Sequence, residues 1–197
     1  MSNAPSKPVS FSRPKVGYFS NRPRILTALN QRQQVGGIFC DLTKAFDCVN
    51  HTILLNKLYY YGIWGKYHCR FRSYLENRKQ RVSISPHILE HDKSSSWETV
   101  TSGLPQGSIL GPLLFIIYFN DLPCGLHQAA KTVIYADDTS VLLTAKELKI
   151  KINYTLDYVI GWFLANGLTL DMEKTDIMKF TSCYCQNEAF QIIYQKR

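Results

Sequence analysis

A pair of adjacent aspartates inside an apolar stretch is the feature that most limits the folds open to this chain. Residues 132–135 and 140–143 are short apolar runs typical of strands, and Asp137 and Asp138 lie between them, so the stretch predicts a hairpin. Aspartate tolerates turn dihedrals, which accounts for a single carboxylate at such a position. Two adjacent carboxylates repel each other and disfavour folding unless cations neutralise them. The hairpin is therefore either a plain turn or part of a cation site.

A second apolar segment, residues 36–41, also ends in a carboxylate, Asp41. If the two strand ends adjoin, Asp41, Asp137 and Asp138 converge on one edge of a sheet. Such an oxygen-rich site suits Mg²⁺, and two ions about 3.5–4 Å apart stabilise the attacking and leaving oxygens of a phosphoryl displacement. The alternative is that Asp137 and Asp138 only form the turn and that Asp41 only caps the helix after it.

Hydrophobic periodicity predicts further elements along the chain. The predicted helices cover residues 25–34, 53–61, 66–76, 108–119 and 146–165. The predicted strands cover residues 36–41, 81–84, 98–101, 132–135, 140–143 and 175–181. Because strands and helices intermix and hairpins occur, the pattern favours an α+β fold over a parallel α/β sheet. Residues 1–24 predict a disordered basic tail, and residues 182–197 carry no assignable pattern.

Charge is distributed unevenly along the chain, whose formal net charge is +8. Residues 1–81 hold 14 Lys and Arg against 3 acidic residues, whereas residues 82–197 hold 9 against 12. This basic front indicates nucleic acid or another polyanion as a partner, or it is only a solvated basic face.

Several classes of protein lack support in the sequence. The longest apolar run, residues 109–119, contains Gly111 and Pro112 and is too short for a membrane span of roughly 20 residues. No signal-peptide pattern is present, and the 6 cysteines at irregular spacings predict free thiols in a reducing compartment. The sequence motifs of P-loop nucleotide hydrolases, serine hydrolases and zincins are also absent.

Four segments of the sequence carry a family resemblance. Tyr135-Ala136-Asp137-Asp138 resembles the Y-x-D-D box of reverse transcriptases, and residues 39–47 resemble their first palm motif. Residues 102–112 resemble the second palm motif, and residues 167–175 are similar to the motif after the catalytic hairpin. The order and separation of the segments agree with that family as well.

The sequences of residues 47–51 and 119–123 look most like those of non-LTR (LINE-type) retrotransposons of animals. The resemblance covers about residues 25–181. It implies an RNA-directed DNA polymerase domain with a polymerase palm, an antiparallel sheet backed by helices, from which fingers and thumb are largely missing. The implied partners are an RNA template, a DNA primer and dNTPs. The implied location is intracellular, nuclear or cytoplasmic, neither secreted nor in a membrane; no pattern indicates an oligomeric state. The alternative is an inactive retroelement remnant that at most binds nucleic acid.

The resemblance also implies roles for single residues. Asp41 and Asp137, with Asp138 beside them, would be the catalytic ligands of two Mg²⁺ ions, which Mn²⁺ can replace. Phe46 matches the steric gate that excludes a ribose 2′-hydroxyl; alternatively, it is a core residue of the next helix.

Three further residues match motif positions. Gln106 would touch the incoming nucleotide, and Gly107 would permit close backbone approach there. Lys174 would assist proton transfer to pyrophosphate, or it is merely solvated. Asp47 matches a recurrent family position to which no role can be assigned from the sequence.

A basic stretch with neighbouring aromatic residues suits a template–primer groove. Its predicted nucleic-acid-binding residues are Arg70, Arg72, Arg78, Lys79 and Arg81. The aromatic residues around it are Tyr59, Tyr60, Tyr61, Trp64, Tyr67, Phe71 and Tyr74. The alternative is that these aromatic side chains belong to the core and that the basic ones are merely solvated.

Overall fold

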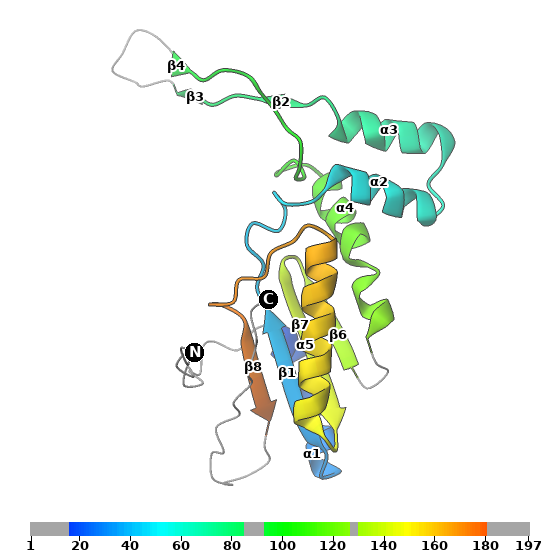
Figure 1. Cartoon of the computed structure of the whole chain (residues 1–197), viewed down its shortest axis with the longest axis vertical. Helices are drawn as coiled ribbons and strands as arrows, with labels where there is room; N and C mark the ends of the chain where they lie inside the picture. Colours follow the sequence, from blue (N-terminus) through cyan, green and yellow to red (C-terminus); the bar gives the residue numbers. More distant parts are fainter. Residues whose placement is uncertain (1–15, 85–92, 127–129, 181–197) are drawn as a thin grey trace, which may run out of the picture. The chain divides into compact units, whose positions relative to one another are not determined.

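A computed structural model describes residues 16–84, 93–126 and 130–180 of the chain. The chain forms two compact units, one from residues 1–43 and 121–197 and the other from residues 44–120. We call the first the sheet unit and the second the hairpin unit, and each is described by itself (Figure 1). The palm region predicted for residues 25–181 runs through both units, and residues 182–197 lie outside the described part.

The sheet unit contains an antiparallel sheet of four strands. They are β1 (Gln34–Cys40), β6 (Ala130–Tyr135), β7 (Asp138–Ala145) and β8 (Asp176–Phe180). Their order is β6-β7-β1-β8, so the two central strands come from distant parts of the sequence (Figure 1). The predicted α+β fold with an antiparallel sheet is confirmed.

Helix α5 (Leu148–Ala165) packs on one face of this sheet. It confirms the helix predicted for residues 146–165. Its apolar residues Leu148 and Ile152 are buried over Gly36 of β1. A Cβ atom at Gly36 would lie 2.7 Å from the Ile152 Cδ1 atom, so any larger residue there would force the Ile152 side chain to shift. The short 3₁₀ helix η1 (Leu122–Gly125) contacts the same helix, and the Tyr158 hydroxyl donates to the Leu122 carbonyl at 3.2 Å.

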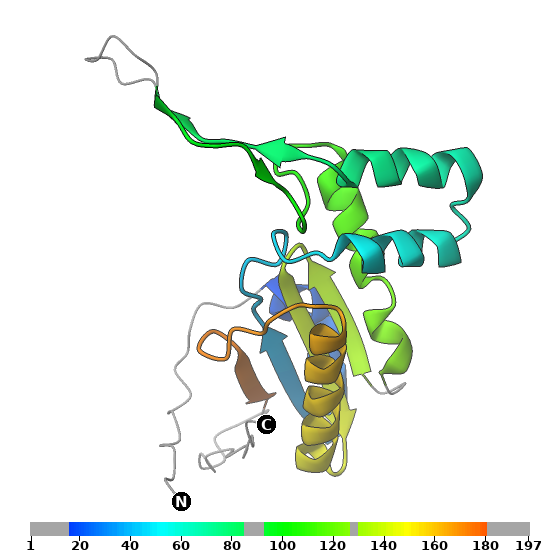
Figure 2. The same ribbon diagram turned by 45° about the horizontal axis from the view of Figure 1, so that its top comes forward.

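Helix α1 (Val16–Asn30) packs on the opposite face of the sheet (Figure 2). Ile25 and Ala28 form a buried cluster there with Val35 of β1 and Leu142 of β7. Neighbouring residues of a strand point to opposite faces, which is why Val35 meets α1 while Gly36 meets α5. The prediction of a tail over residues 1–24 is wrong for residues 16–24, which are helical with Pro23 inside the helix.

Three helices build the body of the hairpin unit. They are α2 (His51–Tyr60), α3 (Gly65–Leu75) and α4 (Leu110–Phe119). Leu54 and Leu58 of α2 are fully buried, as are Leu114 and Tyr118 of α4, and the two helices pack together. Asn50 caps α2, because its side-chain oxygen accepts a hydrogen bond from the backbone N–H of Ile53 at 3.1 Å.

An extended arm of short strands completes the hairpin unit (Figure 2). Strand β2 (Lys79–Gln80) pairs with β5 (Glu98–Thr99), and β3 (Ser83–Ile84) pairs with β4 (Lys93–Ser94). All residues of these four strands are exposed. The arm is therefore held by backbone pairing rather than by a buried core.

Two further predictions concern the environment of the chain. None of the four described cysteines, Cys40, Cys48, Cys69 and Cys124, forms a disulfide with another described residue. In the described ranges there is no helix with the length and apolar character needed to cross a membrane.

Candidate active site

Three carboxylates lie at the same end of neighbouring strands in the sheet unit. Asp41 directly follows β1, whose last residue, Cys40, pairs with Thr139 of β7. In the adjoining hairpin, Tyr135 of β6 pairs with Asp138, the first residue of β7, which leaves Asp137 in the turn. By continuation of this register, Asp41 is opposite Asp138. The predicted convergence of the strand ends is thus what the fold produces.

The turn between β6 and β7 is tight and conformationally demanding. Its two central residues are Ala136 and Asp137, and Ala136 has a φ of 51°. Positive φ is uncommon for a residue with a side chain and costs roughly 1–2 kcal/mol for an L-residue. Asp137 is exposed at the tip, whereas Asp138 and Asp41 are half-buried. The chain therefore maintains strain at the position that presents Asp137 to solvent.

The residue types at this edge fit a hard divalent cation. Asp41, Asp137 and Asp138 supply only carboxylate oxygens, which Mg²⁺ and Mn²⁺ accept as ligands. Within residues 16–84, 93–126 and 130–180, no three His, Cys, Asp or Glu side chains form a group that could hold a metal ion. The fold brings the carboxylates to one edge without closing them into a ligand cluster.

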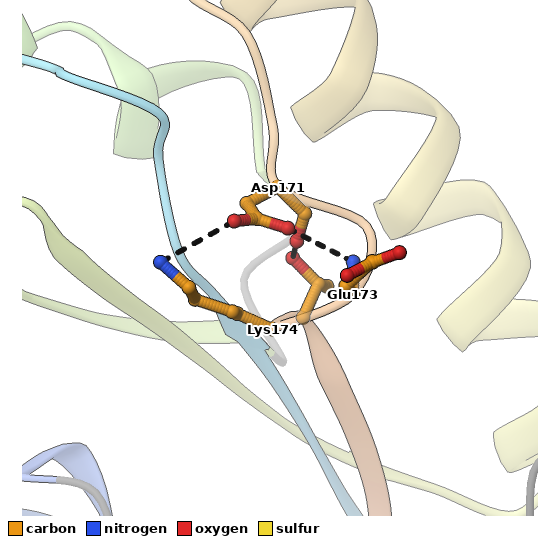
Figure 3. Close-up of polar contacts among 4 residues, drawn as sticks. Asp171, Glu173 and Lys174 are labelled. Atoms are coloured by element: carbon orange, nitrogen blue, oxygen red, sulfur yellow. Dashed lines mark hydrogen bonds and ion pairs between the residues drawn. The ribbon is translucent and has the colours of Figure 1, made fainter.

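The segment of residues 167–175 is hydrogen-bonded to the backbone of Asp41. The N–H of Asp171 donates to the carbonyl of Asp41 at 2.9 Å, and the N–H of Thr43 donates to the carbonyl of Thr169 at 3.0 Å. In the same turn, the Lys174 Nζ lies 3.4 Å from the Asp171 Oδ2 (Figure 3). The side chain of Lys174 thus belongs to a turn that is tied to the carboxylate edge.

The Asp171 carboxylate organises this turn. Partial burial of its side chain, which is 22% exposed, acts to raise its pKa. The N–H of Glu173, which donates to the Asp171 Oδ1 at 3.0 Å, and the charge of Lys174 outweigh burial, so the pKa of Asp171 lies below its ordinary value of 3.8. The ionised form of Asp171 is therefore the one that the turn requires.

Phe46 and Phe115 stack in the hairpin unit. Their ring centroids are 4.1 Å apart and their planes differ by 13°. Phe115 is buried, whereas Phe46 is only half-buried. One face of Phe46 packs against Phe115, which agrees with the alternative that Phe46 is a core residue. Because the ring stays partly exposed, its role as a steric gate remains a prediction.

The segment that contains Gln106 and Gly107 lies against the loop before α2. Gln106 Nε2 donates to the Asp47 Oδ1 at 3.1 Å. Gly107 has a φ of 78°, and no atom within 4 Å would meet a Cβ there, so its backbone borders open space. The structure brings Asp47 and Gln106 together, a pairing that sequence spacing did not reveal.

Further contacts hold these two loops in register. The N–H of Gly103 donates to the Val49 carbonyl at 2.8 Å, and the Nε2 atom of the buried His51 lies 2.7 Å from the Gly103 carbonyl oxygen. A Cβ at Gly103, whose φ is 87°, would lie 2.8 Å from the Asp47 carbonyl oxygen. Sequence reasoning missed His51 and Gly103 as supports. The one signal for them in the sequence is that both lie inside segments that resemble family motifs, residues 47–51 and 102–112.

The predicted nucleic-acid-binding residues are exposed on α3 and the arm. Arg81 lies over the Trp97 ring at 4.7 Å, and Arg78 lies over the Tyr74 ring at 5.5 Å. Arg72 lies 3.8 Å from Glu76. Arg78 and Lys79 also line a cavity of about 610 Å³ whose other lining residues include Asp47 and Gln106.

Most of the aromatic residues that surround the basic stretch are exposed rather than buried in the core. The exposed ones are Tyr59, Tyr60, Tyr61, Trp64 and Tyr67, and the half-buried ones are Phe71 and Tyr74. Tyr60 is 86% exposed, and the ring of Trp64 lies 6.1 Å from that of Tyr59. The alternative that these side chains build the core is therefore wrong for the exposed set.

Two solved structures of telomerase share this fold. Apo telomerase from Candida tropicalis, truncated from its C-terminal domain, superposes with a TM-score of 0.61 at 12% identity, over 87% of this chain and 36% of the telomerase. Another apo telomerase from Candida tropicalis gives a TM-score of 0.57 at 13% identity, over 81% and 32%. At these identities the likeness shows the fold alone, an α+β polymerase fold.

Sequence comparison is more specific. The family described as "Reverse transcriptase (RNA-dependent DNA polymerase)" matches residues 6–192, so the chain belongs to the reverse transcriptase family. It is 33% identical over 133 residues to a probable RNA-directed DNA polymerase from transposon BS of Drosophila melanogaster, covering 61% of this chain and 13% of that protein. It is 29% identical over 166 residues to the RNA-directed DNA polymerase from mobile element jockey of Drosophila funebris, covering 80% and 17%.

These relatives confirm the predicted resemblance to reverse transcriptases of non-LTR retrotransposons. The matched part of the chain spans 13% of the transposon BS protein and 17% of the jockey protein, so the relatives are much longer proteins.

Proposed function

We propose that this chain performs nucleotide addition as the reverse transcriptase domain of a non-LTR retrotransposon, extending a DNA primer on an RNA template. The observation that carries the proposal is the convergence of Asp41, Asp137 and Asp138 at one edge of the antiparallel sheet. Family membership supplies the reaction class, and the carboxylate edge supplies residues of the required chemistry.

In the proposed reaction, the 3′-hydroxyl oxygen of the primer attacks the α-phosphorus of a dNTP. A P–O bond forms to the primer, the bond between the α-phosphorus and the bridging oxygen breaks, and pyrophosphate leaves. The hydroxyl proton passes to solvent. Two Mg²⁺ ions held by Asp41, Asp137 and Asp138 would activate the hydroxyl and neutralise the triphosphate charge.

The residues of the sheet unit have separate roles in this proposal. The β1 strand and the Asp171 N–H fix the backbone of Asp41, and the tight turn holds Asp137 at the end of the hairpin, next to the first residue of β7. Lys174 would give a proton to the departing pyrophosphate, and its contact with Asp171 orients the ammonium group. Each role needs a rigid backbone, which the paired strands and the bound turn provide.

The substitution Asp137→Asn tests the catalytic assignment. We expect Mg²⁺-dependent dNTP incorporation on an RNA template with a DNA primer to fall about a thousandfold, since metal-supported charge neutralisation contributes several kcal/mol. The matched control is Asp157→Asn, which changes another exposed aspartate, on α5. Circular dichroism and thermal unfolding of both variants establish that the fold is retained.

Two results would overturn the proposal. The catalytic assignment is wrong if Asp137→Asn incorporates dNTPs as fast as the unsubstituted chain. Salt-sensitive RNA binding by an unsubstituted chain that incorporates nothing would favour the inactive-remnant function instead.

We also propose that the exposed basic side chains of the hairpin unit contact the phosphates of the template and primer, with exposed aromatic rings available for base stacking. Arg78→Ala should weaken RNA binding and reduce the slope of log affinity against log salt by about 0.7–1. Lys149→Ala removes an exposed lysine of α5 and is the matched control. Equal slopes for Arg78→Ala and Lys149→Ala would assign the basic stretch to solvation only.

A further inference from the structure

A carboxylate–carboxamide contact in the hairpin unit is not explained by the chemistry above. Gln106 Nε2 donates to the Asp47 Oδ1 at 3.1 Å, and both side chains are exposed. Both also line the cavity of about 610 Å³ that Arg78 and Lys79 border. A carboxylate here would repel the phosphates of a bound nucleotide, so its presence calls for a compensating role.

The chemistry of the two groups dictates how Gln106 is oriented. An ionised carboxylate only accepts hydrogen bonds, whereas a carboxamide carries one acceptor and one donor end. The NH₂ end of Gln106 must therefore face Asp47, and the carbonyl oxygen Oε1 faces away from it. Without Asp47, a glutamine side chain at an exposed position samples many rotamers and both amide orientations.

Asp47 is itself held from both sides. Its N–H donates to the Lys44 carbonyl at 2.9 Å, and its carbonyl accepts from the Ser102 Oγ at 3.2 Å. The absence of a Cβ at Gly103 lets the second loop approach the Asp47 backbone. The backbone from which the Asp47 carboxylate projects is thus held by contacts that do not involve Gln106.

We propose that Asp47 is a positioning residue that holds the Gln106 carboxamide in a single orientation, with its oxygen directed to the incoming nucleotide. The proposal rests on the proposed function, because it takes Gln106 as a nucleotide contact. It gives a defined role to Asp47, which the sequence leaves without one. By holding Gln106 in place beforehand, Asp47 reduces the conformational freedom that Gln106 would otherwise lose when the nucleotide binds.

The test compares Asp47→Leu, which removes the acceptor, with Asp47→Asn, which keeps an acceptor oxygen. Asp47→Leu should raise the KM for dNTP about threefold to tenfold, the value of one ordinary hydrogen bond, and leave kcat within about twofold. Asp47→Asn should restore the KM of the unsubstituted chain. Asp157→Leu, a change of the same type on α5, is the control, and thermal unfolding shows whether each variant is folded.

Repeating the comparison in a chain that lacks the Gln106 carboxamide separates the positioning role from general damage to the loop. In a Gln106→Ala chain, Asp47→Leu should change the KM no further, because there is no carboxamide left to orient. An equal rise in KM with and without Gln106 would overturn the positioning role, as would an Asp47→Asn variant as impaired as Asp47→Leu.

Equilibrium binding of a fluorescent dNTP analogue to the full chain separates this proposal from the proposed function. A chain that binds the analogue with a Kd sensitive to Asp47→Leu, yet incorporates nothing, overturns the proposed function and supports the positioning role. Equal binding by the unsubstituted and Asp47→Leu chains overturns the positioning role alone. A chain that neither binds nor incorporates overturns both.

Discussion

The central strand β7 of the sheet unit and the outer elements of the hairpin unit differ in how far their residues are buried. In the sheet unit, β7 is buried from Thr139 to Leu143, and the helices α1 and α5 cover the two faces of the sheet. In the hairpin unit, α3 has one buried residue, Leu75, and every described strand residue of the arm is exposed. The β7 strand of the sheet unit is therefore enclosed by packing, while α3 and the arm of the hairpin unit leave most of their side chains open to solvent.

The greatest change in stability is expected from the core of the sheet. Leu143→Ala removes a fully buried side chain of β7 and should lower the free energy of unfolding by about 2–5 kcal/mol. Tyr60→Ala, at an 86% exposed side chain of the hairpin unit, should change it by less than about 0.5 kcal/mol. Urea denaturation measures both. A similar cost for the two variants would remove the distinction between the units.

The next effect tests whether the hairpin unit has a constrained site of its own. Gly103→Ala combines a φ of 87° with a Cβ 2.8 Å from the Asp47 carbonyl oxygen, and it should cost at least about 2 kcal/mol. Gly62→Ala has a similar φ of 88° but open space around the Cβ, and it should cost about 1 kcal/mol. If thermal unfolding shows equal losses, the close contact of the two loops contributes nothing.

A smaller effect, of opposite sign, is expected at the turn between β6 and β7. Ala136→Gly should raise the free energy of unfolding by up to about 1 kcal/mol, because glycine adopts the φ of 51° without strain. Ala165→Gly, in the last turn of α5, should instead lower it by about 0.5–1 kcal/mol. Destabilisation by Ala136→Gly would show that the strain is absent. A lower dNTP incorporation rate despite the gain in stability would show that the strain positions Asp137.

The weakest of these effects concerns the pH dependence of the sheet unit. The pKa of Asp171 is below 3.8 in the folded chain, so its ionised form stabilises the fold above the unfolded pKa. That contribution is lost as the pH falls through the folded pKa, and Asp171→Asn should remove this part of the acid dependence. Denaturation followed from pH 6 down to about pH 2 measures it, with Asp157→Asn as the control. Parallel curves for Asp171→Asn and the unsubstituted chain would contradict the role of this turn.

Much of the sheet unit is predictable from the sequence, because burial imposes clear patterns. The apolar runs around Asp137 and Asp138 identified the hairpin, and the strand ending at Asp41 is in place within two residues. The start of helix α1 was missed because residues 1–24 are Ser/Pro-rich and basic and show no clear periodicity. Tertiary packing of Ile25 and Ala28 on the sheet overrides that local signal.

The hairpin unit is less predictable, because its key contacts join segments distant in sequence. Asp47 and Gln106 carry no shared periodicity, and their hydrogen bond follows from how two loops cross. Exposed tyrosines such as Tyr60 resemble core residues by type, since large aromatic side chains are mostly buried. For such surfaces the sequence supplies the chemistry of the residues but not which of them meet.

The order of elements along the chain separates β1 from its sheet partners during synthesis. Strand β1 is made before the hairpin unit, and its partners β7 and β8 follow only after that unit. The hairpin unit is continuous in sequence, so it can fold first while β1 waits as an unpaired apolar strand. Until the residues from Asp138 onward are made, β1 has neither of its sheet partners, and an unpaired apolar strand is a surface that can pair with another chain.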